Sequence, residues 1–349
     1  MNDKIVSISD ESIIWTVQSQ LSPKGKSTSS TSITFELIHV LHVYGIALFN
    51  LSQGIADNVG NYDSDITLSE NQRRTFDDNL ANAVNLLNTS AGIFKYISEI
   101  AIDNFESARD VDSQILNREY NTGLSKLSLA ISQSLAIRKL MSPLFAYTLQ
   151  NPGPPLPKNH PSPQILLKLH IDTSSLFSVS RMLLKSSIKS TFKVQHVDLP
   201  TDLKLFTKRC ENFHSSIAKK WLGVDAASNG QTGFAIAWLR LSYDELSESS
   251  SSTSSERFKL LSKNTRKARD ERKSLLEVEL SSIDTYLKAY KQLNDTVSIV
   301  YVNQFTFLYI IHRFTSNVYH RHLLYCLKYL MADHLLILFP SHYQNQHGH

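Results

Sequence analysis

The sequence predicts an all-α fold, and three observations support this. Only 11 glycines and 10 prolines occur among 349 residues, which leaves long stretches without helix breakers. Within those stretches, apolar residues recur in alternating steps of three and four, the spacing of one helix face. No segment is rich in the alternating pattern of strands, although Thr16 to Gln20 fits a short edge strand.

Composition is that of an ordinary globular protein, with 42% hydrophobic and 19% charged residues. The net charge of +4 is mild, and Lys and Arg form no long block, so we expect no nucleic-acid partner. Cys210 and Cys326 form no metal or disulfide pattern, which favours structural thiols in a reducing compartment. Residues 1–10 show no signal-peptide pattern, and the apolar stretch Val297 to Ile311 is too interrupted to span a membrane. We therefore expect a cytoplasmic protein.

The first two predicted helices lie in the N-terminal third. Residues 32–58 carry one apolar stripe that includes Leu37, Tyr44 and Leu51 and a second that includes Ile38. A helix that is apolar on more than one face is expected to be internal. After a polar loop at residues 58–65, a second helix carries a stripe of Leu80, Val84, Leu87, Ala91 and Phe94.

The middle of the chain predicts two further helices joined by a proline-rich connection. Residues 120–149 continue the helical spacing, and their small residues would let neighbouring helices approach closely. Six of the ten prolines fall in the loop at residues 151–163, which we expect to be stiff and extended. Its Pro154 to Pro157 fits a PxxP ligand of an SH3 domain or a plain loop. Ser162 as N-cap and Pro163 at the first position begin the next helix.

The C-terminal part of the helical region predicts a tetratricopeptide-like pair and a long helix. Residues 220–223 and 232–240 indicate a helix–turn–helix in which Trp238 fills the space between helices. The serine-rich segment 247–256 predicts a solvated loop open to phosphorylation. A helix from about residue 256 to 293 carries an apolar seam. The seam consists of Leu276, Leu280, Ile283, Leu287 and Tyr290.

Residues 303–349 differ in composition from the rest of the chain. They contain four charged residues and seven of the 13 histidines. Two interpretations stay open, namely a poorly specified tail and translated intron or frameshifted sequence from a faulty gene model. We treat this segment as an atypical tail.

Catalytic and metal-binding patterns are weak throughout. His39 and His42 share a helix face, but no carboxylate lies one turn away to complete a metal site, so we expect packed histidines. Asp77-Asp78 and Asp270-Glu271 are typical of solvated helix faces. The glycine-rich phosphate loops, the nucleophile elbow and the zinc-protease motif do not occur. The sequence therefore predicts neither an enzyme nor a cofactor.

Two segments instead predict a binding groove. Residues 128–139 and 165–169 carry apolar residues on successive turns, with Lys139 beside the first set and Lys168 within the second. Ile165 and Leu169 are one turn apart, which is the spacing that holds an amphipathic partner helix. The alternative is that both are core residues of a solenoid.

Six segments in order resemble the BRO-type domain of the ALIX and PalC families, most closely the PalC form. Each segment is short, and their order across residues 32–302 gives the resemblance its specificity. The segments are Leu48 to Asn50, Ser90 to Ile97, Leu129 to Lys139, Ile165 to Leu169, Gly233 to Arg240 and Asn294 to Ser298.

The resemblance implies an elongated, curved helical domain with a tetratricopeptide-like middle. It also implies binding of the C-terminal amphipathic helix of an ESCRT-III subunit of the Snf-seven/CHMP-four type. By position, Ile165 and Leu169 match the apolar contacts, and Lys139 matches a basic residue beside Ala136. Lys168, between the two apolar residues, belongs to the same predicted site. Ala136 stands where ALIX-like members have an aromatic residue, so the contact here is either weaker or open to a bulkier partner side chain.

The resemblance also implies a division of the chain and a cellular role. We expect a short or truncated N-terminal segment at residues 1–31, a BRO-type domain at residues 32–302 and the tail at residues 303–349.

PalC-like proteins act in fungal ambient-pH signalling, which leads to proteolytic activation of a zinc-finger transcription factor at alkaline pH. This predicts a cytoplasmic adaptor recruited peripherally to endosomes or to cortical foci at the plasma membrane. The alternative is a BRO-type or tetratricopeptide-like scaffold in endosomal cargo sorting.

Overall fold

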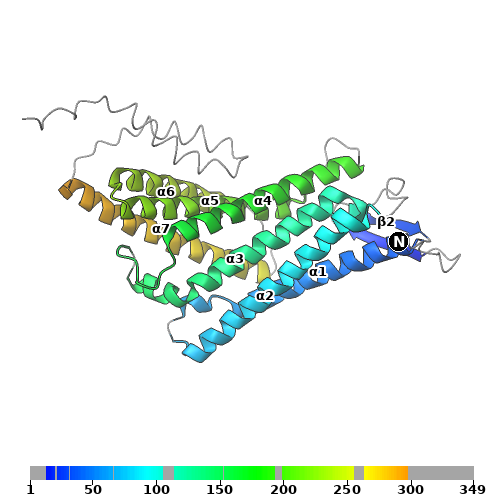
Figure 1. The fold of residues 1–349 in the computed structure, drawn as a ribbon, viewed down its shortest axis with the longest axis horizontal. Helices are drawn as coiled ribbons and strands as arrows, with labels where there is room; N and C mark the ends of the chain where they lie inside the picture. Colours follow the sequence, from blue (N-terminus) through cyan, green and yellow to red (C-terminus); the bar gives the residue numbers. More distant parts are fainter. Residues whose placement is uncertain are drawn as a thin grey trace, which may run out of the picture. The chain divides into compact units, whose positions relative to one another are not determined.

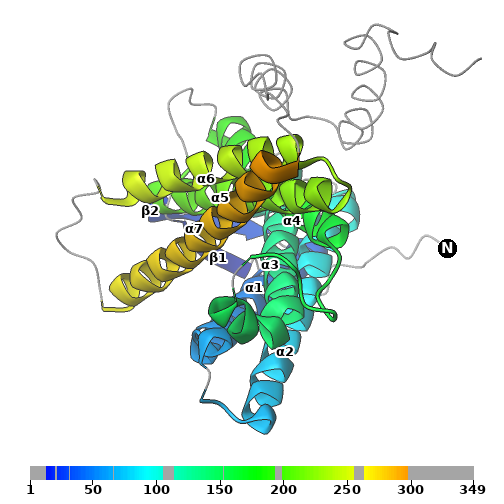
Figure 2. The same ribbon diagram turned by 90° about the vertical axis from the view of Figure 1, so that its left-hand side faces the viewer.

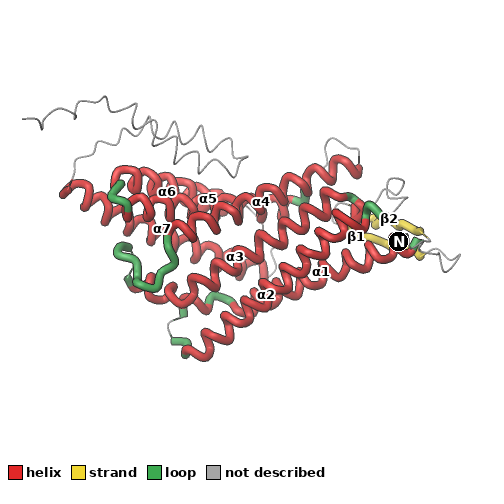
Figure 3. Tube along the Cα trace, viewed as in Figure 1, coloured by secondary structure: helices red, strands yellow, loops and turns green. Residues whose placement is uncertain are grey.

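The structure is a computed structural model that describes residues 13–19, 22–30, 32–65, 67–104, 114–151, 153–192, 199–254 and 263–297. All of them belong to one compact unit, residues 1–300. The described residues form two strands and seven long helices, and Figures 1 and 3 show that helices dominate. The all-α prediction is confirmed. The tail at residues 303–349 lies outside the described residues.

A β-hairpin precedes the first helix. β1 (Ile13–Ser19) pairs antiparallel with β2 (Ser22–Ser30), and Trp15 lies opposite Thr28. The predicted edge strand at Thr16 to Gln20 overlaps β1, but its partner strand was missed. β2 consists of Ser, Pro, Lys, Gly and Thr with no apolar alternation, so the signal that marks a half-buried strand is absent from it.

The first two helices have clear boundaries. α1 (Ile33–Val59) ends at Gly60, whose φ of 57° is one that glycine adopts without steric cost. α2 (Glu70–Tyr96) begins with a capping box, in which Ser69 and Gln72 each bind the other's backbone N–H. The capping box satisfies two backbone N–H groups that α2 itself leaves unpaired.

The prediction that α1 is internal is wrong for one of its faces. Ile38 and Gly45 are buried against α2, as expected. Leu37, Tyr44 and Leu51, however, are 43%, 52% and 56% exposed. The pattern correctly showed two apolar faces, but only packing decides whether each face has a neighbour.

Within the described residues, α1 is also the one helix that is long and apolar enough to cross a membrane, with a mean hydropathy of 1.4 over its most apolar window. The helix packs one face onto α2, where Phe35 and Ile38 are completely buried. A core helix passes the same test of length and composition, so this finding assigns no membrane span.

A proline-rich loop joins the next two helices. α3 (Arg118–Gln150) and α4 (Pro163–Phe192) match the predicted elements, and the Ser162 hydroxyl accepts a hydrogen bond from the Ile165 N–H at 3.3 Å. Leu156 in the loop packs against the apolar core of α5 to α7. The loop is therefore attached to the domain through Leu156.

The remaining helices are α5 (Thr201–Ser228), α6 (Thr232–Ser254) and α7 (Lys263–Val297). The predicted helix–turn–helix is the α5–α6 pair, and Trp238 is buried in it. The predicted serine-rich loop at residues 247–256 is helical as far as Ser254. The Ser247 and Ser249 hydroxyls donate to carbonyls of the preceding turn, Ser249 to the Glu245 carbonyl at 2.9 Å, which is compatible with a helix.

Each helix packs against its predecessor, so the helices follow one another as in a solenoid (Figures 1 and 2). Serine hydroxyls cross several of these contacts and donate to a carbonyl of the facing helix. These hydrogen bonds join the Ser90 hydroxyl to the Gly45 carbonyl at 2.8 Å, Ser125 to Ala91 at 2.9 Å, Ser180 to Gly123 at 2.8 Å and Ser242 to Ser216 at 2.7 Å. Small residues therefore do allow close approach, as predicted.

Ion pairs tie α5 to the last two helices. Lys220 of α5 is 4% exposed, and its ammonium lies 2.7 Å from the Glu279 carboxylate of α7. Lys219 pairs with Glu245 of α6 at 2.6 Å. Since the Lys220 side chain is almost fully desolvated, its charge depends on this one carboxylate and on the nearby face of Trp221.

Candidate partner-binding surface

The two predicted groove segments lie level on neighbouring helices. The Gln133 side-chain amide donates to the Leu169 carbonyl at 3.1 Å, and the Ser180 hydroxyl donates to the Gly123 carbonyl. Later residues of α3 therefore contact earlier residues of α4, so the two helices are antiparallel. This register brings the turn at Ala136 beside the first turns of α4.

All five predicted residues reach solvent at least in part. Ile165 is 52% exposed, whereas the following Leu166 and Leu167 are buried in the core. Lys168 and Ala136 are exposed, and Leu169 and Lys139 are half-buried. We call the set Ala136, Lys139, Ile165, Lys168 and Leu169 the α3–α4 surface.

Leu140 extends the α3–α4 surface and was missed. It is 41% exposed and lies one turn after Ala136. The spacing of four could have identified it, because residues four apart share a helix face. Its position next to Lys139 places an apolar side chain beside the basic one.

A buried polar cluster lies behind the α3–α4 surface. His170 of α4 and His214 of α5 approach through their Nδ1 atoms at 2.9 Å, so one ring donates and the other accepts. The Nε2 atom of His214 lies 3.2 Å from the Ser134 hydroxyl of α3. Because the three residues are far apart in the sequence, no local spacing could have predicted the cluster.

Burial keeps both histidines neutral. It lowers the pKa of His214 to about 4 and holds the pKa of His170 well below its ordinary value, with a smaller effect from the neighbouring ring. Burial likewise lowers the pKa of His42 to about 4. His39 and His42 are both buried, so the prediction of packed histidines is confirmed.

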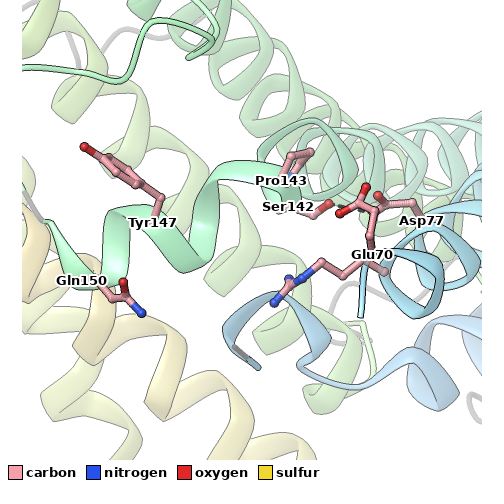
Figure 4. Close-up of a pocket in the computed structure, with 7 residues that line it drawn as sticks. Glu70, Asp77, Ser142, Pro143, Tyr147 and Gln150 are labelled. Atoms are coloured by element: carbon pink, nitrogen blue, oxygen red, sulfur yellow. Dashed lines mark hydrogen bonds between the residues drawn. The ribbon is translucent and has the colours of Figure 1, made fainter. Parts of the chain in front are cut away.

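A pocket of about 400 Å³ opens between the start of α2 and the end of α3. Figure 4 shows Tyr147 and Gln150 on one side of it and Glu70 and Asp77 on the other. Asp77 accepts hydrogen bonds from the Tyr62 hydroxyl and, at 2.7 Å, from the Ser142 hydroxyl. Burial and the bond to Asp77 raise the pKa of Tyr62, so this hydroxyl stays protonated and acts as a structural donor.

The described residues contain no group of three or more His, Cys, Asp or Glu side chains placed to hold a metal ion. Cys210 is half-buried and packs beside the apolar cluster of α2 to α4. The α3–α4 surface differs in kind, because its exposed and half-buried apolar side chains lie beside lysines.

Two known proteins are similar to this chain. The chain is 30% identical over 315 residues to the pH-response regulator protein palC of Cryptococcus neoformans var. neoformans serotype D (strain B-3501A), a match that covers 76% of the chain and 64% of the relative. A solved structure described as the basis for endosomal targeting by the Bro1 domain matches with a TM-score of 0.49 and 16% identity, over 80% of the chain and 62% of that structure. The chain thus spans less than two thirds of the length of either.

The family comparison covers most of the chain. Residues 4–316 match the sequence profile described as the BRO1-like domain. This range contains both strands, all seven described helices and the α3–α4 surface. The chain therefore belongs to the BRO1-like domain family.

Proposed function

We propose that this protein is a non-catalytic adaptor that binds the C-terminal amphipathic helix of an ESCRT-III subunit of the Snf-seven/CHMP-four type. The binding site is the α3–α4 surface. The similarity to a pH-response regulator supports a role in fungal ambient-pH signalling, upstream of the proteolytic activation of a zinc-finger transcription factor.

The exposure of Ile165 carries this proposal. An isoleucine that is 52% exposed at the start of a packed helix leaves apolar surface in water, which a partner would cover. Leu169 lies one turn further on and is half-buried, so the two side chains offer the spacing that an amphipathic helix uses. Leu140 continues the apolar area onto α3.

Affinity is expected to be modest. Burying the Ile165 and Leu169 side chains contributes about 3–6 kcal/mol before association costs are subtracted. Lys139 and Lys168 flank the apolar residues and favour a partner helix with acidic residues beside its stripe. The small Ala136 leaves room for a bulkier side chain of the partner. Such a weak contact suits a reversible adaptor.

The location of the protein follows from that partner. Such an adaptor would be recruited from the cytoplasm to endosomes or to cortical plasma-membrane foci. There the ESCRT-III subunit would hold it peripherally through the α3–α4 surface.

The test is a pulldown of the full chain with the C-terminal helix of the ESCRT-III subunit as bait. Ile165→Asp and Leu169→Asp each place a charge in the proposed contact, so binding should fall at least tenfold. Leu293→Asp is the matched control, because Leu293 on α7 is 48% exposed and lies outside the α3–α4 surface. Far-UV circular dichroism of all three variants should stay helical.

Unchanged binding by both α4 variants would exclude this surface. Equal loss in the Leu293→Asp control would show that any new exposed charge disturbs the domain. Binding of bait peptides that lack an amphipathic helix, with no binding of this bait, would favour a scaffold of the cargo-sorting kind.

A further inference from the structure

Three serines of this chain are followed directly by proline, the pair that proline-directed protein kinases recognise. They are Ser22, Ser142 and Ser162, and the sequence contains no Thr-Pro pair. The structure describes the side-chain surroundings of Ser142 and Ser162. These surroundings differ, and one of the two serines is open to a kinase.

Ser142 is closed to modification. It lies inside α3 and is 3% exposed, and its hydroxyl donates to the Asp77 carboxylate of α2 at 2.7 Å. A protein kinase takes the serine and its neighbours into its cleft in an extended form. Both the helix and its packing on α2 would have to open before Ser142 could react.

Ser162 has the opposite environment. It is exposed and lies in irregular backbone just before α4, and the following Pro163 disfavours a helical conformation at Ser162 itself. Pro161 and Pro163 have no N–H, so they donate no backbone hydrogen bonds that would have to break. The hydrogen bonds that would have to open include those from the Ile165 and Leu166 N–H groups to the Ser162 carbonyl, at 3.0 Å and 3.2 Å. Drawing this segment into a kinase cleft therefore disturbs the first turn of α4 and leaves the core in place.

Ser162 also lies beside the α3–α4 surface. Its hydroxyl accepts a hydrogen bond from the N–H of Ile165, three residues further on, at 3.3 Å. The hydrogen bond between Gln133 and Leu169 sets the register of the antiparallel pair. Lys139, six residues after Gln133, therefore lies level with the residue that follows Ser162. A group attached to the Ser162 hydroxyl would stand close to an apolar and a basic member of that surface.

We propose that Ser162 is the phosphorylation site of a proline-directed kinase and that its phosphate switches off partner binding at the α3–α4 surface. The effect on binding rests on the function proposed above. In the transfer, the Ser162 oxygen bonds to the γ-phosphorus of ATP, and the bond from that phosphorus to the β–γ bridging oxygen breaks. ADP leaves, and the hydroxyl proton passes to a base of the kinase.

Charge sets the direction of the effect. A phosphate carries about −1.5 to −2 charges at pH 7, so it roughly cancels the charges of Lys139 and Lys168. Those two lysines favour acidic residues beside the apolar stripe of the partner, and the phosphate repels the same acidic residues. Because a negative group at the N-terminus of a helix stabilises that helix, α4 stays folded while its outer face loses its attraction for the partner.

Phosphorylation in vitro tests the site. The full chain, in a Ser22→Ala background, is incubated with MgATP and a purified mitogen-activated protein kinase, and the modified residues are mapped by mass spectrometry. Phosphate should enter Ser162 and leave Ser142, the internal control, unmodified. A folded chain that takes no phosphate at Ser162, or takes as much at Ser142, would overturn the assignment.

Pulldown with the amphipathic-helix bait tests the switch. Ser162→Asn and Ser162→Asp both keep a side chain that caps α4 and differ in charge. Ser162→Asn should bind like the wild type, Ser162→Asp about threefold more weakly, and the phosphorylated chain at least tenfold more weakly. The losses should shrink at high salt, because the repulsion is electrostatic.

Equal binding by the phosphorylated and unphosphorylated chains would overturn the switch. A loss that is as large in Ser162→Asn as in Ser162→Asp would also overturn it, because that loss would not come from charge. A wild type that binds no bait would contradict the proposed function and with it the switch, while the mass spectrum would still decide whether Ser162 is modified.

Discussion

Gly123 of α3 faces Leu184 of α4 at very short range. A Cβ at Gly123 would lie 2.8 Å from the Leu184 Cγ and 3.2 Å from the Leu184 backbone nitrogen. A side chain can rotate away from such an overlap, but the backbone nitrogen of a packed helix cannot. We expect Gly123→Ala to destabilise the domain by about 1–2 kcal/mol, because the overlap outweighs the helix propensity that alanine adds.

Chemical denaturation of Gly123→Ala measures this cost, and Gly92→Ala is its matched control. Gly92 lies in α2 with nothing within 4 Å of its missing Cβ. The control should gain up to about 1 kcal/mol from propensity alone. A Gly123→Ala protein as stable as its control would show that α3 and α4 can separate without cost.

At the scale of single residues, the sequence shows which side chains are apolar but not which of them are exposed. In the run from Ile165 to Leu169, four apolar residues are equally good core candidates by type. The structure exposes Ile165 and buries Leu166 and Leu167. Which of the four is exposed depends on the direction from which α3 and α5 approach α4. The local sequence carries no information about that direction. For Ile165, the resemblance supplied the assignment to the partner contact, and that assignment stays a prediction.

At the scale of whole helices, serines recur at the contacts between neighbouring helices. Ser180 is completely buried, and its hydroxyl donates to the Gly123 carbonyl at 2.8 Å. We expect Ser180→Ala to cost about 1 kcal/mol through the lost hydrogen bond. Ser180→Val should cost about 1–3 kcal/mol more, since its extra methyl groups have no space between α3 and α4.

Thermal or urea unfolding ranks these variants, with Ser281→Val on the exposed side of α7 as the control. The control should change stability by no more than about 0.5 kcal/mol. A Ser180→Val protein as stable as Ser180→Ala would show that the small size of Ser180 is not needed for the close packing of α3 and α4.

Whole elements were predictable where their apolar spacing is regular. The seven helices follow the steps of three and four, and Ser162 with Pro163 marks the start of α4. The predictions for two elements were wrong for the same physical reason. β2 and the end of α6 are both serine-rich, and serine side chains suit turns, strand edges and helix ends alike. Their pairing with β1 and with the preceding helical turn decided the outcome.

At the scale of the whole molecule, the described residues bury several neutral histidines in separate layers. His42 packs on α1 between Phe94 and Tyr120, while His170 and His214 join α4 to α5. The packing of α1 on Phe94 and Tyr120 and the contact of α4 with α5 thus each include an imidazole that burial keeps uncharged. The layers share this property, although no motif in the sequence links them.

This arrangement predicts acid sensitivity over a defined pH range. Burial lowers the folded-state pKa of His42 and His214 to about 4, whereas in the unfolded chain both titrate near 6.5. As pH falls below 6.5, the unfolded state therefore binds protons first and is stabilised. The stability that the neutral rings contribute is full above pH 6.5 and is lost as pH falls to about 4, up to about 3 kcal/mol for each ring. Urea unfolding at pH 7.5, 6.5, 5.5 and 4.5 should show this decline, and His42→Gln and His214→Gln should each make it shallower. Because glutamine does not titrate, a decline as steep in both variants as in the wild type would assign the acid sensitivity to carboxylates instead.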